Sequence, residues 1–140
     1  MVFRSREKDD FKNPIMERMT PEFITAVEEG EVFVFGSNAQ GRHLGGAARV
    51  AMERFGAVWG VGEGLQGRSY ALLTMEGIDC LAAAASRFIA FAREHPELRF
   101  FVTAVGCGIA GYSPKEIAPL FADAVPLSNV WLPLSFWECL

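Results

Sequence analysis

A glycine-rich loop, GCGIAG at residues 106–111, is the segment of this sequence best suited to chemistry. It follows FFVTAV, a run typical of a buried strand, and precedes a predicted helix start at 113–116. Glycines let successive backbone N–H groups turn toward one point, and a helix start adds free N–H groups and a positive dipole end. We therefore expect a phosphate-binding loop, although a tight turn without ligand is the alternative. The candidate contacts are Gly106, Cys107, Gly108, Ile109, Ala110, Gly111 and Tyr112.

The same loop has the G-x-G-x-x-G spacing of dinucleotide-binding folds. A Rossmann site also needs a following strand that ends in Asp or Glu about 20 residues further on. The predicted strand at 130–132 ends instead at Pro133. GEGLQG at 62–67 has the same spacing but precedes a strand rather than linking a strand to a helix. A nucleotide-dependent enzyme of Rossmann type is therefore an alternative function.

A second candidate loop follows another predicted buried strand, in the segment FGSNAQGRHLGGAARVAMERFG. Asn38 can donate and accept hydrogen bonds, which suits a ribose hydroxyl, and Gly45 and Gly46 would let the backbone approach a ligand. The alternative for Asn38 is an Asx turn that holds its own loop. Arg42 and His43 are the nearest charged or titratable groups, and a merely solvated histidine is the more common case.

These two loops resemble those of the macrodomain fold, and most closely its compact subgroup of ADP-ribose readers and ADP-ribosyl hydrolases. The resemblance rests on VFGSNAQGRHLGGAARVAMERFG and on the late GCGIAGY, and in element order it covers roughly residues 31–132. It implies that residues 106–111 grip a diphosphate and that Asn38 lies near the distal ribose. It also implies that the paired glycines of the second loop line the same cleft, with Tyr112 beside the sugar.

The resemblance is weaker for catalysis than for binding. The acidic residue that follows the late glycine loop in the hydrolases falls on Ala110, and no clear Gly-Asp-Ile/Leu segment is present to hold adenine. If the chain hydrolyses an ADP-ribosyl linkage, the candidates for activating water are His43 and Glu63, with Arg42 and Arg68 to steady charge.

The segment GVGEGLQGRSYALLT at 60–74 is longer and more polar than the resemblance implies. Glu63, Gln66 and Arg68 are its candidates for a function particular to this chain, because long glycine-rich loops in small domains are often functional. An ordinary solvated loop is the equal alternative.

The three cysteines have no framework spacing, which indicates free thiols and a reducing compartment. No pair has metal-ligand spacing, so we expect neither a metal site nor a cofactor. Cys107 lies near a predicted helix start, but no histidine adjoins it in sequence, and we expect a packing role. The aromatic residues Trp131, Phe136 and Trp137 form either a patch for a partner or second copy (a homo-oligomer) or part of the core.

Helix and strand signals alternate along the chain with short connections. This predicts an α/β fold, a three-layer α/β/α sandwich with a mainly parallel mixed sheet, macrodomain-like. Residues 1–13 are expected to form a polar arm and residues 14–140 one domain. The strands at 32–35, 100–105 and 130–132 should be neighbours in one sheet with helices on both faces.

Further elements follow from start and stop signals. Thr20-Pro21-Glu22 predicts a helix that ends at Gly30, Asp79 is the expected cap of a helix apolar nearly all round, and Pro119 should kink the last helix. The predicted helices span 20–30, 46–55, 79–94 and 114–125, and a further strand spans 70–74.

Charge and composition limit the partners. A net charge of −4 does not supply the basic face that long nucleic acids require, so we expect a small nucleotide ligand held by backbone groups. The charged N-terminus has no apolar signal region and no apolar stretch could span a bilayer, which predicts a cytoplasmic protein without membrane contact. The predicted function is binding of ADP-ribose or a related phosphate-bearing nucleotide, with hydrolysis left open. An interaction protein that keeps the fold without the site is a further alternative.

Overall fold

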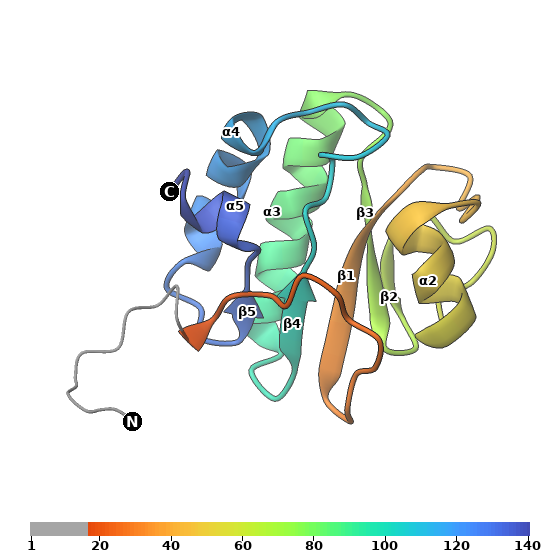
Figure 1. Ribbon diagram of the computed structural model, residues 1–140, viewed down its shortest axis with the longest axis horizontal. Coiled ribbons are helices and arrows are strands. Elements are labelled where there is room, and N and C mark those ends of the chain that lie inside the picture. Colours follow the sequence, from red (N-terminus) through yellow and green to blue (C-terminus); the bar gives the residue numbers. More distant parts are fainter. Residues whose placement is uncertain (1–16) are drawn as a thin grey trace.

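The computed structural model describes residues 17–140 as a five-stranded, mostly parallel sheet with helices (Figure 1). The sheet order is β2-β3-β1-β4-β5. The central strand β1 (Glu31–Ser37) pairs in parallel with β3 (Ser69–Leu73) and β4 (Arg99–Val102), and β4 pairs in parallel with β5 (Val130–Trp131). Only β2 (Gly64–Gln66) is antiparallel, against β3. The predicted neighbourhood of the three strands is confirmed, whereas the predicted polar arm lies outside the described residues.

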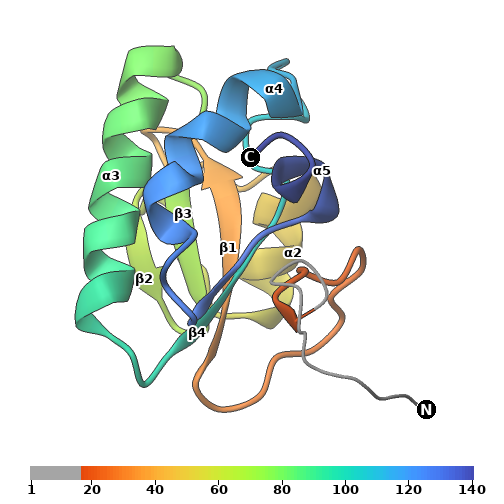
Figure 2. The same cartoon turned by 90° about the vertical axis from the view of Figure 1, so that its left-hand side faces the viewer.

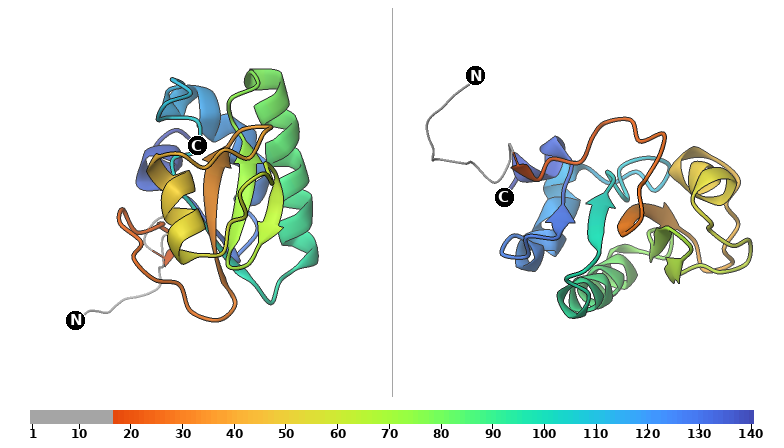
Figure 3. Two further views of the ribbon diagram at one scale, coloured as in Figure 1. Left: turned by 90° about the vertical axis from the view of Figure 1, so that its right-hand side faces the viewer. Right: turned by 90° about the horizontal axis from the view of Figure 1, so that it is seen from below.

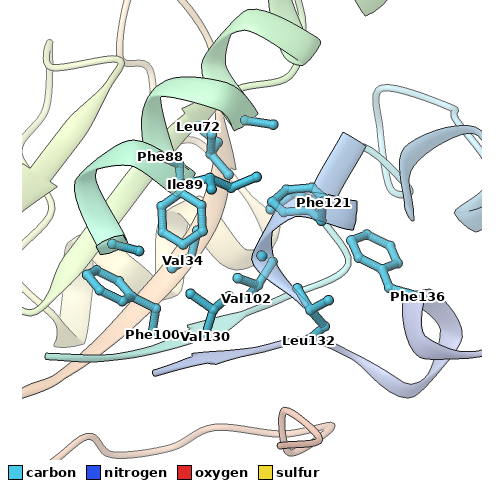
Figure 4. Close-up of a cluster of buried hydrophobic side chains, with 14 of the residues drawn as sticks. Val34, Leu72, Phe88, Ile89, Phe100, Val102, Phe121, Val130, Leu132 and Phe136 are labelled. Carbon is cyan, nitrogen blue, oxygen red and sulfur yellow. The ribbon is translucent and has the colours of Figure 1, made fainter. Parts of the chain in front are cut away.

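The two faces of β1 bury different side chains because successive residues of a strand point to opposite sides. Val32 and Val34 belong to a core with α3 (Ile78–Glu94), drawn in Figure 4. Phe33 and Phe35 belong to a second core with α2 (Gly46–Arg54). Figure 3 shows α2 and α3 on opposite sides of the sheet.

The helix α3 is more one-sided than predicted. Its buried residues recur at helical spacing, while Ala83 and Ala90 lie on an exposed face. An alanine is tolerated on either face of a helix, so the run of alanines concealed the amphipathic pattern. The predicted Asp79 cap is also wrong: Gly77, with φ of 96°, precedes the first turn and makes no side-chain cap.

The predicted helix at 20–30 does not form, and this segment has no regular secondary structure. It runs from β5, where the Thr20 N–H donates to the Leu132 carbonyl (2.9 Å), to the start of β1 (Figure 1). A ten-residue helix spans about 15 Å, less than half the extended reach of the same chain. Arg68 donates to the Val27 carbonyl (3.0 Å). This bond gives the Val27 carbonyl the hydrogen-bond partner that it would have found within a helix.

The last predicted helix is shorter and changes type. Ser113 and Glu116 form the expected capping box of α4 (Pro114–Ile117), but the chain continues as the 3₁₀ helix η1 (Ala118–Ala124). Pro119 has no N–H to donate back along an α-helix, which accounts for the change. A short helix that the sequence did not predict, α5 (Leu134–Trp137), follows β5.

The segment before β1 also closes the β5 edge of the sheet (Figure 2). Met19 forms a parallel bridge with Leu132. The Arg18 guanidinium lies 5.1 Å from the Trp137 ring centroid, and the Trp137 indole N–H donates to the Arg18 carbonyl at 3.0 Å. Arg18 also donates to three carbonyls, those of Ala124, Val125 and Val130.

Phe136 and Trp137 are buried, which confirms a core role for these two aromatic residues. Trp131 is partly buried and packs edge-on against Phe101. Between residues 17 and 140, no helix has both the length and the apolar character needed to cross a membrane.

Candidate functional site

A cleft of about 410 Å³ lies at the carboxyl ends of β1, β3 and β4. Its floor includes Ser37, Thr74 and Thr103, which end or directly follow those strands. The Thr103 hydroxyl donates to the Val34 carbonyl (2.7 Å), and the Thr74 hydroxyl donates to the Ser37 carbonyl (3.2 Å). Ligands of open α/β sheets bind at this end of the strands, which makes the cleft the candidate site.

One wall of the cleft is the amino end of α2. Gly45, Gly46, Ala47 and Ala48 line it, and Gly45 is an N-cap residue that provides no side-chain cap. Within the described chain, the amides of Gly46, Ala47 and Ala48 have no hydrogen-bond acceptor. Gly46 has φ of 60°, a conformation that glycine adopts without strain. This wall therefore presents free N–H groups and the positive end of a helix dipole.

The opposite wall is the glycine-rich loop, which Gly106, Gly108, Ile109 and Ala110 bring into the cleft. The loop folds on itself, since the Tyr112 N–H donates to the Gly106 carbonyl at 2.9 Å. The amides of Gly108, Ile109 and Ala110 have no acceptor anywhere in residues 17–140. A Cβ at Gly108 would meet open space, whereas one at Gly106 would press on Leu81 and Ile117. Gly108 thus borders the cleft and Gly106 permits core packing.

The helix that meets the cleft is α2 and not the helix that starts after Ser113. Neither Ser113 nor Pro114 lines the cleft, and the Glu116 amide is already bonded to the Ser113 hydroxyl (3.3 Å). The start of this capping-box helix, which the sequence places at the same site, therefore lies outside the lining of the cleft. The first turn of α2, after the second glycine loop, lines the cleft instead.

Seven of the ten predicted contact residues line the cleft: Asn38, Gly45, Gly46, Gly106, Gly108, Ile109 and Ala110. Cys107, Gly111 and Tyr112 do not. Tyr112 packs against the α3-side core. Cys107 packs there too, and its burial, followed by the proximity of Glu116 and Cys139, raises the pKa of its thiol. A neutral, packed thiol agrees with the expected packing role.

Asn38 lines the cleft, but its side chain is directed to its own loop. Its Oδ1 accepts the Arg42 N–H at 2.9 Å, and its Nδ2 donates to the Arg42 carbonyl at 3.1 Å. The Asx-type alternative is thus the observed one.

Neither candidate for water activation lines the cleft. His43 is 1% exposed, and its Nε2 lies 3.0 Å from the Val58 carbonyl, so this nitrogen must carry the proton and donate. Its ring also packs edge-on against Phe35. Glu63 makes a two-bond ion pair with Arg87, at 2.6 and 3.0 Å. Both side chains therefore have structural partners.

One polar residue of the 60–74 segment, Gln66, ties together the backbone on which the loop that carries Asn38 packs. Gln66 accepts from the Val58 amide (2.7 Å) and donates to the Val61 carbonyl (3.0 Å). Gly41 packs so closely on this segment that a Cβ would overlap the Gly60 carbonyl carbon and the Val61 nitrogen. Residues 60–66 therefore form a buttress for the cleft wall, and only Thr74, at the end of the 60–74 segment, lines the cleft itself.

Sequence reasoning missed several cleft residues. Thr74 and Thr103 are signalled only by their position at strand ends, and Ala47 and Ala48 by their place in the first turn of a helix after two glycines. Arg42 is the only charged side chain among the lining residues within 17–140, which include no carboxylate, histidine or thiol.

The chain was compared with models of protein families, with curated proteins and with solved structures, and none of them matches it.

Proposed function

We propose that the cleft binds the diphosphate of an ADP-ribose-type nucleotide through main-chain amides contributed by both of its walls. The observation that carries this proposal is the set of six amides without an acceptor in the described chain, three at the start of α2 and three at 108–110. Main-chain amides at a helix start and in a glycine-rich turn bind phosphate groups. They also allow an acidic chain, with a net charge of −4, to hold an anion.

The arrangement of the fold supports the same proposal. The mostly parallel sheet has α2 on one face and α3 on the other, which agrees with a macrodomain-like three-layer α/β/α sandwich. The two loops that carry the sequence resemblance are the two walls of one cleft. A ligand with two linked phosphates would contact both walls, and the remaining cleft volume suits a nucleotide-sized molecule.

Binding is better supported than cleavage. Hydrolysis needs a group that can move a proton at the reacting atoms. The described residues that line the cleft include no histidine, cysteine or carboxylate to do so. His43 and Glu63, the candidates from the sequence, are held by Val58 and Arg87. We therefore propose a reader of ADP-ribose-type ligands in preference to a hydrolase.

A Rossmann-type enzyme is less well supported. The cofactor ribose in that fold is held by an acidic residue after the next strand. Here β5 is followed by Leu132 and Pro133, and Leu132 is buried.

Gly108→Val tests the proposal by filling one wall. Gly108 has no positive φ and its Cβ direction is open, so the variant should keep the melting temperature of the parent. Gly45→Val is the matching change on the opposite wall, because Gly45 has an extended φ of −160° and the same open surroundings. Ala83→Val, on the exposed face of α3, is the control.

Calorimetric titration with ADP-ribose should show binding by the parent and by Ala83→Val. Both cleft variants should lose at least about tenfold in affinity, since a valine obstructs several charge-assisted hydrogen bonds. Folded cleft variants that bind as tightly as the parent would refute the proposal, as would a parent that does not bind ADP-ribose.

A further inference from the structure

Asn38 holds the main chain of Arg42 at both of its polar groups. The side-chain amide of Asn38 accepts from the Arg42 N–H (2.9 Å) and donates to the Arg42 carbonyl (3.1 Å). The loop is closed further by the Gly41 N–H, which donates to the Asn38 carbonyl at 2.9 Å. The Asn38 side chain therefore fixes the position from which Arg42 projects.

The neighbours of Arg42 fix the same position from both sides. Gly41 is buried against the Gly60 backbone, and the Gly60 N–H donates to the Gly41 carbonyl at 2.9 Å. His43 is buried on the other side and bonds to the Val58 carbonyl. Arg42 is thus an exposed residue between two buried ones, so its side chain leaves a backbone that cannot easily shift.

The Arg42 guanidinium has no hydrogen-bond or ion-pair partner in the part of the chain that the structure describes. Among the described residues that line the cleft, it is the only charged group. Several other arginines of the domain have partners, although Arg93 has none within residues 17–140. Arg49 bonds to Glu53, Arg87 to Glu63 and Arg68 to Val27. A cation without a partner, on a fixed backbone beside six free amides, is suited to an anionic ligand group. Guanidinium groups bind phosphate oxygens in pairs and with defined geometry.

We propose that Arg42 is the residue that makes the cleft select ligands by phosphate charge, and that Asn38 is a positioning residue that acts through Arg42. This inference rests on the proposed function and adds a ligand class: nucleotides with charged phosphates are preferred over neutral nucleosides. It also gives Asn38 a role through Arg42, whereas the sequence resemblance implies a position near the distal ribose.

The test compares Arg42→Gln with Arg49→Gln, an exposed arginine on α2 that does not line the cleft. The probes are ADP-ribose, inorganic pyrophosphate and adenosine, titrated at fixed ionic strength. Arg42→Gln should weaken ADP-ribose and pyrophosphate about tenfold or more, because hydrogen bonds between charged groups are the strong ones. Its affinity for adenosine should stay within about twofold, and Arg49→Gln should match the parent for all probes. An equal loss for adenosine, or no loss for ADP-ribose, would overturn the inference.

A double-mutant cycle tests the role of Asn38. If Asn38 acts through Arg42, adding Asn38→Ala to Arg42→Gln should weaken ADP-ribose no further, because the two losses are one and the same. Additive losses would show that Asn38 contacts the ligand itself. Asn38→Ser is the second variant if Asn38→Ala does not fold, since its neutral hydroxyl can still accept from a main-chain N–H in a turn and the amide donor is lost.

The probes separate this inference from the function on which it rests. If pyrophosphate binds in an Arg42-dependent way and ADP-ribose does not bind, the inference of selection by phosphate charge is supported. The proposal that the ligand is an ADP-ribose-type nucleotide is then refuted. If ADP-ribose binds the parent and Arg42→Gln equally, the function stands and the inference fails. If neither probe binds the parent, both fail.

Discussion

Gly41→Ala should destabilise the domain more than any other glycine change at a comparable backbone conformation. Gly41 has φ of 64°, which costs a residue with a Cβ about 1–2 kcal/mol. The new Cβ would also overlap the Gly60 carbonyl carbon and the Val61 nitrogen. These are backbone atoms that no rotamer change can move, and such overpacking costs about 1–3 kcal/mol more. The expected loss in the free energy of unfolding is therefore about 2–5 kcal/mol.

Gly46→Ala provides the matched comparison. Gly46 has nearly the same φ, 60°, but a Cβ there would have nothing within 4 Å. It should show the conformational cost alone, so the two variants should differ by about 1–3 kcal/mol. Equilibrium urea unfolding measures both free energies, and the melting temperatures should differ by about 2–4 °C per kcal/mol. Equal destabilisation of the two variants would refute the close packing of the Asn38 loop on its buttress.

Two further predictions concern the α3-side core. Asn129→Ala should cost about 1–3 kcal/mol of unfolding free energy, measured by urea unfolding, because its amide nitrogen donates to three carbonyls at the end of α3 and the turn that follows. A loss below about 0.5 kcal/mol would contradict this. Cys107, as the sole cysteine of a variant, should react with iodoacetamide more slowly when folded than in urea at pH 8. Burial raises its folded pKa, so the folded rate should rise only at higher pH than the unfolded rate does; equal rates would refute the assignment.

The strands and the cleft-facing glycines were predictable because their signals are local. The run VFVF requires burial on both faces, and it forms the centre of the sheet. Parallel strands bring their carboxyl ends together, so loops far apart in sequence could be assigned to one edge. The sequence signal for the capping box at Ser113 is equally local, and the capping box forms as expected.

The failures have a common physical origin in tertiary contacts. The segment 20–30 has a strong local helix signal, yet it spans the distance from β5 to β1 and its Val27 carbonyl is bonded to Arg68. Their place on glycine-rich loops favours His43 and Glu63 as cleft residues, but Val58 and Arg87 hold their side chains elsewhere. Which helix start faces the cleft also depends on packing that the sequence does not reveal.

The most direct test of the central claim is a ¹⁵N-resolved NMR titration of the protein with ADP-ribose. The six amides of Gly46, Ala47, Ala48, Gly108, Ile109 and Ala110 are the proposed phosphate donors. They should show the largest amide shift changes and should become protected from solvent exchange together, with one common affinity. Amides around the capping box at Ser113 should change little, because they do not line the cleft. Saturable binding that leaves these six amides unchanged would contradict the account, as would changes confined to one wall.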